Sequence, residues 1–122
     1  ASLRSKTRFF EVPVMEGELN EAIAGIPNPS SFLQMLNFTC KQEDFVVVKL
    51  DIDTPAIEQT IVAVLTQRPA LAALIDELFF EYHFYIDGLD FGWKTHVQGD
   101  VDTAIGTMFR LRSLGIRAHF WI

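Results

Sequence analysis

The chain has 122 residues, 49% of them hydrophobic, and a formal net charge of −6 at neutral pH. This length fits one domain with a single modest core, and the apolar content argues against disorder. The acidic balance argues against a phosphate-binding surface, which needs clustered Lys and Arg, so we expect no nucleic-acid partner.

Cysteine use and hydropathy favour an intracellular protein without a membrane span. Cys40 is the one cysteine of the chain, which excludes an internal disulfide and a cysteine-based metal cluster. No apolar run reaches membrane-spanning length, and the polar, basic first residues carry no secretory signal. Since the chain begins with Ala1 rather than Met, a fragment and a complete subunit both stay open.

The N-terminal part of the chain is predicted to be largely irregular. Residues 8–14 (RFFEVPV) favour one short strand, and Gly and Pro punctuate residues 16–30 as turns. We therefore treat residues 1–29 as an irregular segment with one short strand. A short helix over residues 32–36 follows, because its apolar residues fall on one face.

The clearest strand covers residues 45–50. Its sequence, FVVVKL, is β-branched and almost continuously apolar, which is typical of a strand buried on both faces of a parallel sheet. Thr54 followed by Pro55 predicts a helix start, because a hydroxyl residue caps a helix and proline suits its first position. This helix is expected over residues 55–67, and Pro69 interrupts it.

Two further strands and another long helix complete the pattern. A short turn is expected over residues 71–75, a strand over 78–84, a glycine-bearing loop over 85–99, a helix over 101–114 and a strand over 116–121. Alternation of this kind predicts an α/β fold, in which parallel or mixed strands are joined by right-handed crossovers and flanked by helices.

Three stretches of the sequence carry a family resemblance: EDFVVVKLDIDTPAIEQTIV, LIDELFFEYHF and FRLRSLGIRAHFW. Together they resemble the C-terminal half of FkbM-like, S-adenosylmethionine-dependent methyltransferases, and the resemblance covers about residues 30–122. It implies a partial Rossmann-like methyltransferase sheet, with residues 1–122 as the C-terminal portion of one methyltransferase-like domain. It also implies O-methyl transfer, with S-adenosylmethionine as the cofactor.

Two departures from the family's pattern bear on activity. The family's first strand and Gly-rich turn have no counterpart here, and the seven glycines of the chain are scattered. Where the family commonly has Glu-Gly after the acidic pair, this chain has Asp53-Thr54-Pro55. We therefore expect no measurable S-adenosylmethionine binding by the chain alone. The alternative to an enzyme is a non-catalytic structural or interaction subunit of a larger assembly that keeps the fold.

The missing first strand also predicts a partner. Without it, residues 45–50 form an open, apolar sheet edge, which stable proteins cover. We expect a protein partner, or the N-terminal half of the same domain, to cover this edge. The helix over residues 55–67 is expected to expose some of Ile57, Ile61 and Leu65 for the same reason.

Polar residues gather where two predicted strands end, the place where parallel α/β sheets bind ligands. Asp51, Asp53 and His83 are the predicted catalytic group. The carboxylates are candidates for binding substrate hydroxyls or a divalent cation, and His83 is a candidate base or ligand. For Lys49 and Glu81 we expect a structural ion pair inside the sheet.

Each candidate also has a purely structural interpretation. Asp53 then helps to start the following helix, Asp51 faces solvent, and His83 is a hydrogen-bonded, half-buried residue. No metal centre is expected from the three histidines, because nothing spaces them as ligands on one element. His119 and Trp121, near the end of the chain, are expected to be packing residues.

Overall fold

The computed structural model describes residues 14, 31–83, 97 and 99–121. Within them lies a three-stranded parallel sheet in the order β1-β2-β3. The strands are β1 (Val47–Leu50), β2 (Glu77–Phe80) and β3 (Arg117–Phe120). This confirms the predicted α/β architecture with a parallel sheet. The strand predicted over 8–14 and almost all of the loop over 85–99 lie outside the described residues.

The helices are α2 (Phe32–Thr39), α3 (Pro55–Gln67), α4 (Pro69–Ala72) and α5 (Val101–Ser113). The two long helices predicted from the sequence are confirmed, α3 over its full predicted extent. Each of α3 and α4 has a proline in its first turn, so Pro69 ends one helix and begins the next. None of the described helices has both the length and the hydropathy that crossing a bilayer requires.

The second strand is shorter than predicted. It stops at Phe80, whereas the strand was predicted over residues 78–84. The reason lies in the neighbouring strands, because β1 ends at Leu50 and β3 ends at Phe120, the two residues in register with Phe80. One further hydrogen bond joins β1 and β2 beyond that point: the Glu81 amide donates to the Leu50 carbonyl at 3.1 Å.

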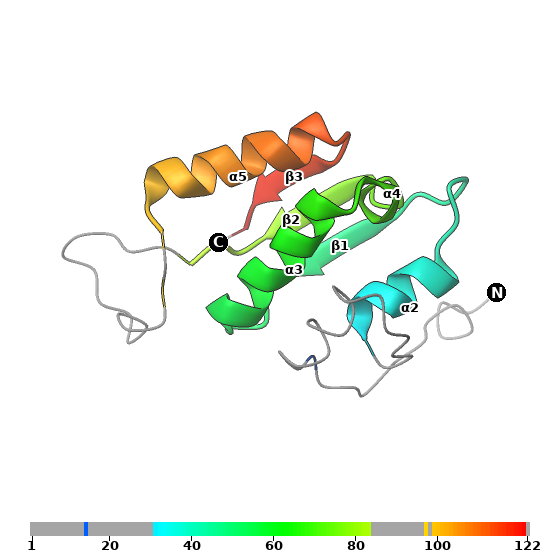
Figure 1. Cartoon of the computed structure of the whole chain (residues 1–122), viewed down its shortest axis with the longest axis horizontal. Coiled ribbons are helices and arrows are strands. Elements are labelled where there is room, and N and C mark those ends of the chain that lie inside the picture. The colour runs from blue at the N-terminus through cyan, green and yellow to red at the C-terminus, as the bar shows by residue number, and fades with distance from the viewer. Residues whose placement is uncertain (1–13, 15–30, 84–96, 98, 122) are drawn as a thin grey trace.

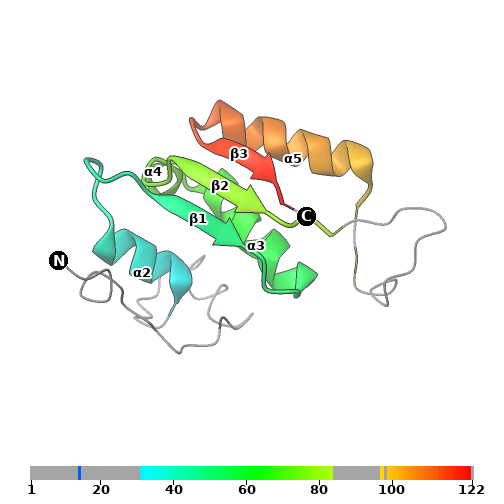
Figure 2. The ribbon, with the colours of Figure 1, turned by 180° about the vertical axis from the view of Figure 1, so that it is seen from behind.

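Two long helices cover the same face of the sheet. Figure 1 shows α3 and α5 in front of the strands, and Figure 2 shows the opposite face, across which α3, α4 and α5 do not pass. Helix α2 lies beside the edge strand β1. The arrangement follows from right-handed crossovers that both move in the same direction across the sheet.

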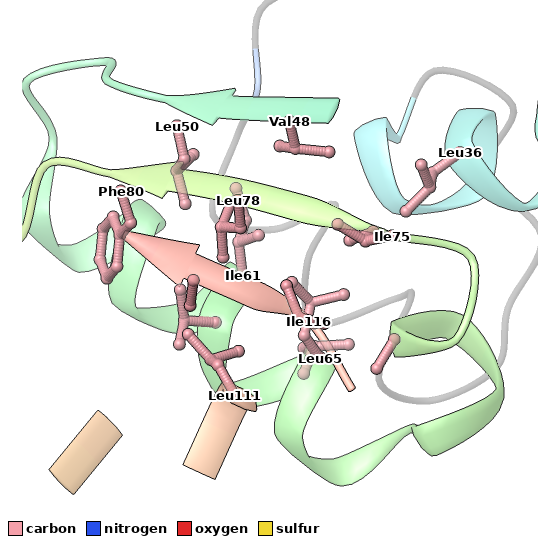
Figure 3. Packing of buried hydrophobic residues seen from close by; sticks show 14 of the residues in the cluster. Leu36, Val48, Leu50, Ile61, Leu65, Ile75, Leu78, Phe80, Leu111 and Ile116 are labelled. Carbon is pink, nitrogen blue, oxygen red and sulfur yellow. The ribbon is translucent and has the colours of Figure 1, made fainter. Parts of the chain in front are cut away.

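The hydrophobic core lies between the sheet and these helices (Figure 3). Its members include Val48, Leu50, Leu78, Phe80, Ile61, Leu65, Leu111 and Ile116, all at most 8% exposed. Burying an aliphatic or aromatic side chain of this size contributes about 1.5–3 kcal/mol. Of the three α3 residues expected to be exposed in part, Ile61 and Leu65 are buried at 1% exposure each, and Ile57 alone is partly exposed.

The prediction that β1 is buried on both faces is also wrong. Val48 and Leu50 are buried, whereas Val47 is 51% exposed and Lys49 is exposed on the opposite side. No helix of the described part of the chain packs over that side. The apolar residues of β1 are therefore divided between the core face of the sheet and a face that no described helix covers.

Candidate functional site

The carboxyl ends of β1 and β2 lie side by side. The two strands are parallel and in register from Val47–Glu77 to Leu50–Phe80. The segments that follow them, 51–53 and 81–83, therefore leave the sheet at the same edge. This is the edge at which open α/β sheets bind ligands.

An imidazole surrounded by carboxylates occupies this edge. The side chain of His83 is 8% exposed, and its Nε2 lies 3.8 Å from Asp53 Oδ1, 3.9 Å from Glu58 Oε2 and 3.7 Å from Glu81 Oε2. The three carboxylates come from the β1–α3 connection, from helix α3 and from the segment after β2. We call these four residues the His83 cluster.

Glu58 is the deepest carboxylate of the His83 cluster, with a side chain 1% exposed. Its Oε1 accepts a hydrogen bond from the Ile52 amide at 2.8 Å, while its Oε2 accepts none from any described residue. Burial raises the pKa of Glu58 above its usual value. The sequence patterns considered above do not single out Glu58. The available signal was a charged residue on the same helical face as the buried Ile61 and Leu65.

Asp53 reaches the cluster through an unusual backbone conformation. Its φ of 53° is in the left-handed region, which Asp tolerates better than most residues that have a Cβ. The turn at Asp53 carries the chain from β1 into α3, and Thr54 occupies the N-cap position. The Asp53 side chain remains 71% exposed, so the cluster has a deep end at Glu58 and an open end at Asp53.

Asp51 joins the cluster to the open face of the sheet. It pairs with Lys49 and shares a hydrogen bond with Glu81. The bond to Lys49, and then the bond to Glu81, hold the pKa of Asp51 below its usual value. The same bond to Asp51 raises the pKa of Glu81 above its usual value.

The predicted Lys49–Glu81 ion pair is therefore wrong. Lys49 pairs with Asp51, two residues along the chain on the same side of the strand, whereas Glu81 lies beyond the end of β2. The Lys49 side chain is 52% exposed, and its Nζ lies 4.7 Å from the ring centroid of Trp121.

The three predicted catalytic residues do lie at one edge of the sheet. Asp53 and His83 are in direct proximity, and Asp51 reaches them through Glu81. Their catalytic role stays a prediction. His119 lies away from the cluster, where its Nε2 is 2.8 Å from Glu77 Oε1 and its ring stacks on Phe79. The expected packing role holds only in part: the rings of His119 and Trp121 both contact Phe79, but the His119 side chain is 42% exposed and Trp121 is 41% exposed.

A groove of about 460 Å³ runs between α3 and α5. Its walls include Gln59, Tyr82, Thr107 and Arg110. Burial raises the pKa of the Tyr82 hydroxyl. Tyr82 stands between Glu81 and His83 in the chain, and no residue of the His83 cluster lines the groove.

Comparisons of the chain with protein-family models, with curated proteins and with solved structures return no match. The likeness to FkbM-like methyltransferases thus rests on the three sequence stretches alone.

Proposed function

We propose that the chain is the C-terminal, acceptor-binding portion of an FkbM-like methyltransferase domain. One observation carries this proposal: a buried imidazole among carboxylates lies at the carboxyl ends of β1 and β2. Parallel α/β sheets place their ligand sites at this edge. The motif likeness supplies the reaction class, and the cluster supplies groups suited to a hydroxylated acceptor.

His83 has the role of general base in this proposal. Transfer to an oxygen requires removal of the acceptor's hydroxyl proton, and a histidine at this position takes that proton on Nε2. The positive charge that the ring gains then lies within 4 Å of three carboxylates. Asp53, at the open end of the cluster, is placed to accept hydrogen bonds from further acceptor hydroxyls.

The described residues do not fit the methyl-donating cofactor. S-adenosylmethionine is held by a first strand and a Gly-rich turn in such domains, and these would pair with the outer edge of β1. Within the described part of the chain, β1 pairs with β2 alone. We therefore assign proton removal and acceptor binding to this chain and no cofactor-binding residue.

Transfer of labelled methyl groups from S-adenosylmethionine to a panel of hydroxylated small molecules tests the proposal. The protein should be tested as expressed from its full gene, because the 122 residues alone are not expected to hold the cofactor. Replacement His83→Ala should reduce transfer at least about 100-fold, the contribution of a general base. His119→Ala, outside the cluster, should leave transfer unchanged. Full activity in His83→Ala would remove the base from the proposal.

The second candidate is a non-catalytic interaction subunit. The observation that favours it is the open face of the sheet, where Phe45 is 64% exposed and Val47 is 51% exposed. Exposed apolar residues that lie together on one face are typical of protein interfaces. Absence of transfer by the full protein, combined with a stable complex that covers this face, would support the subunit over the enzyme.

A further inference from the structure

We infer that the His83 cluster is a divalent-cation site, suited to Mn²⁺, with His83 Nε2 and carboxylate oxygens of Asp53, Glu58 and Glu81 as ligands. This inference does not depend on methyl transfer, because an interaction subunit can also hold a cation at this position. It limits the proposed general base: His83 Nε2 cannot accept a proton while it binds an ion, so His83 acts as a base only in the ion-free protein.

The spacing of the ligand atoms fits a cage around one ion. Ligand atoms of Asp53, Glu81 and His83 all lie within 4.8 Å of one another, and Glu58 Oε2 lies 3.9 Å from His83 Nε2. Ligands bound about 2.1 Å from an ion are separated by about 3 Å when adjacent and by about 4.2 Å when opposite. The cage is thus slightly wider than a filled one. Small torsions of the carboxylates, which belong to three separate segments, are enough to close it.

Glu58 provides the independent indication that a ligand belongs here. Its Oε2 is buried, accepts no hydrogen bond from the described residues and faces His83 Nε2. A buried carboxylate is costly unless it is paired or binds a metal. The Ile52 amide fixes Oε1, so the orientation of Oε2 is set before any ion arrives. Preorientation of a ligand by a backbone donor is common around protein metal ions.

The charge balance calls for a cation. When all are ionised, the carboxylates of Asp53, Glu58 and Glu81 carry three negative charges beside a single imidazole. Lys49 does not join the cluster, since it pairs with Asp51 at the edge. A dication neutralises two of these charges and relieves the repulsion among the carboxylates.

The ligand types select among cations. Three carboxylates favour hard ions such as Mg²⁺, Ca²⁺ and Mn²⁺, whereas an imidazole favours transition metals. Mn²⁺ accepts both kinds of ligand. The order of affinity should therefore be Mn²⁺ above Mg²⁺ and Ca²⁺.

Titration of the metal-free protein with Mn²⁺, followed by the electron paramagnetic resonance signal of the free ion, tests the inference. One ion per chain should bind, and Glu58→Gln and His83→Gln should each raise the dissociation constant at least about tenfold. Glu77→Gln is the matched control, because Glu77 also contacts a histidine, His119, but lies outside the cluster. Its affinity should equal that of the wild type.

Two outcomes would overturn the inference. Either no Mn²⁺ binds to the wild type, or binding persists unchanged in both cluster variants and thus belongs to surface acids. Circular dichroism of each variant shows whether it is folded. The Mn²⁺ affinity of a folded Glu58→Gln variant is sufficient to distinguish binding at the His83 cluster from binding by surface carboxylates. The readout is ion occupancy, so a protein that binds Mn²⁺ and transfers no methyl group refutes the proposed function and leaves the cation site intact.

Discussion

Two residues of the His83 cluster, Asp53 and Glu58, occupy positions that are locally unfavourable. Asp53 has a left-handed backbone conformation, and Glu58 buries a carboxyl group. Neither arrangement favours folding by itself. Residues that carry such costs at one edge of a sheet are expected where a site needs them. Substitutions at these two residues can measure the energetic cost to folding separately from the role in the site.

Replacement of Glu58 by Gln should stabilise the metal-free protein at neutral pH. Since the folded-state pKa of Glu58 is raised above 4.5, its contribution to stability is present below pH 4.5 and is lost as the pH rises through the folded pKa. Gln keeps the acceptor for Ile52 and never ionises. Thermal unfolding in a chelating buffer should show melting temperatures that diverge above pH 4.5, with Glu58→Gln the higher. Parallel curves for the two proteins would contradict the burial argument.

The backbone at Asp53 makes a second prediction. Asp53→Gly should unfold at a higher temperature than Asp53→Ala, because Gly adopts a positive φ freely and a Cβ there costs about 1 kcal/mol. Both variants lose the carboxylate, so the comparison isolates the backbone. Equal melting temperatures would mean that the turn relaxes to a negative φ.

Ligand sites of parallel sheets lie at the carboxyl ends of the strands. This rule predicted part of the site from the sequence and missed the rest. Asp51, Asp53 and His83 follow strands, and parallel strands bring their ends together regardless of what lies between them. Glu58 follows no strand. It reaches the site from the first turn of α3, and only the packing of that helix onto the sheet determines which side chain points at the edge.

At the scale of elements, the sequence predicted the helix boundaries more accurately than the strand boundaries. Thr54 and Pro55 fixed the start of α3, and Gly115 marked the end of α5, both from local chemistry. The end of β2 depends instead on where β1 and β3 stop. No pattern within residues 78–84 carries that information.

Helix α5 offers a matched pair of glycine substitutions. Gly115 has a φ of +95°, whereas Gly106 lies inside the helix, and neither would place an added Cβ within 4 Å of another atom. Gly115→Ala should destabilise the protein by about 1 kcal/mol, and Gly106→Ala should stabilise it by up to about 1 kcal/mol. Urea unfolding of both variants measures the two signs. Two shifts of the same sign would contradict the assigned helix end.

The N-terminal cap of α5 should make the stability of the protein depend on pH with the opposite sign to that expected from Glu58. Asp100 accepts hydrogen bonds from the amide and the hydroxyl of Thr103, which hold the pKa of Asp100 below its usual value. This stabilisation is present above pH 3.8 and is lost as the pH falls through the folded pKa. Asp100→Ala should lower the melting temperature at neutral pH, and the difference should shrink in acid. A constant difference would rule out the charged cap.

At the scale of the whole molecule, helices cover one face of the sheet, and no described helix covers the other. Helices α3 and α5 cover the first (Figure 1). Val47, Phe79 and Trp121 occupy the alternate strand positions and belong to the second. The outer edge of β1 is likewise unpaired by any described strand. A parallel sheet usually has both faces covered. The open face and the open edge together indicate where a partner segment belongs.

Association in solution should depend on this face. Sedimentation of the purified chain should show concentration-dependent association, and Val47→Glu should weaken it. Val101→Glu changes a residue of similar exposure, 50% against 51%, on helix α5 and should have no effect. A monomer at every concentration, with residues 45–50 protected from hydrogen exchange, would show that the chain covers its own edge.

The contact between Lys49 and Trp121 gives the molecule an optical reporter. The Lys49 ammonium lies over the indole and also pairs with Asp51, which is bonded to Glu81 of the His83 cluster. Charge that enters the cluster therefore changes the electric field at the indole through one intermediate ion pair. The chain has two tryptophans, and Trp93→Phe would leave Trp121 as the only emitter. Its emission wavelength would then follow the occupancy of the cluster without any added dye.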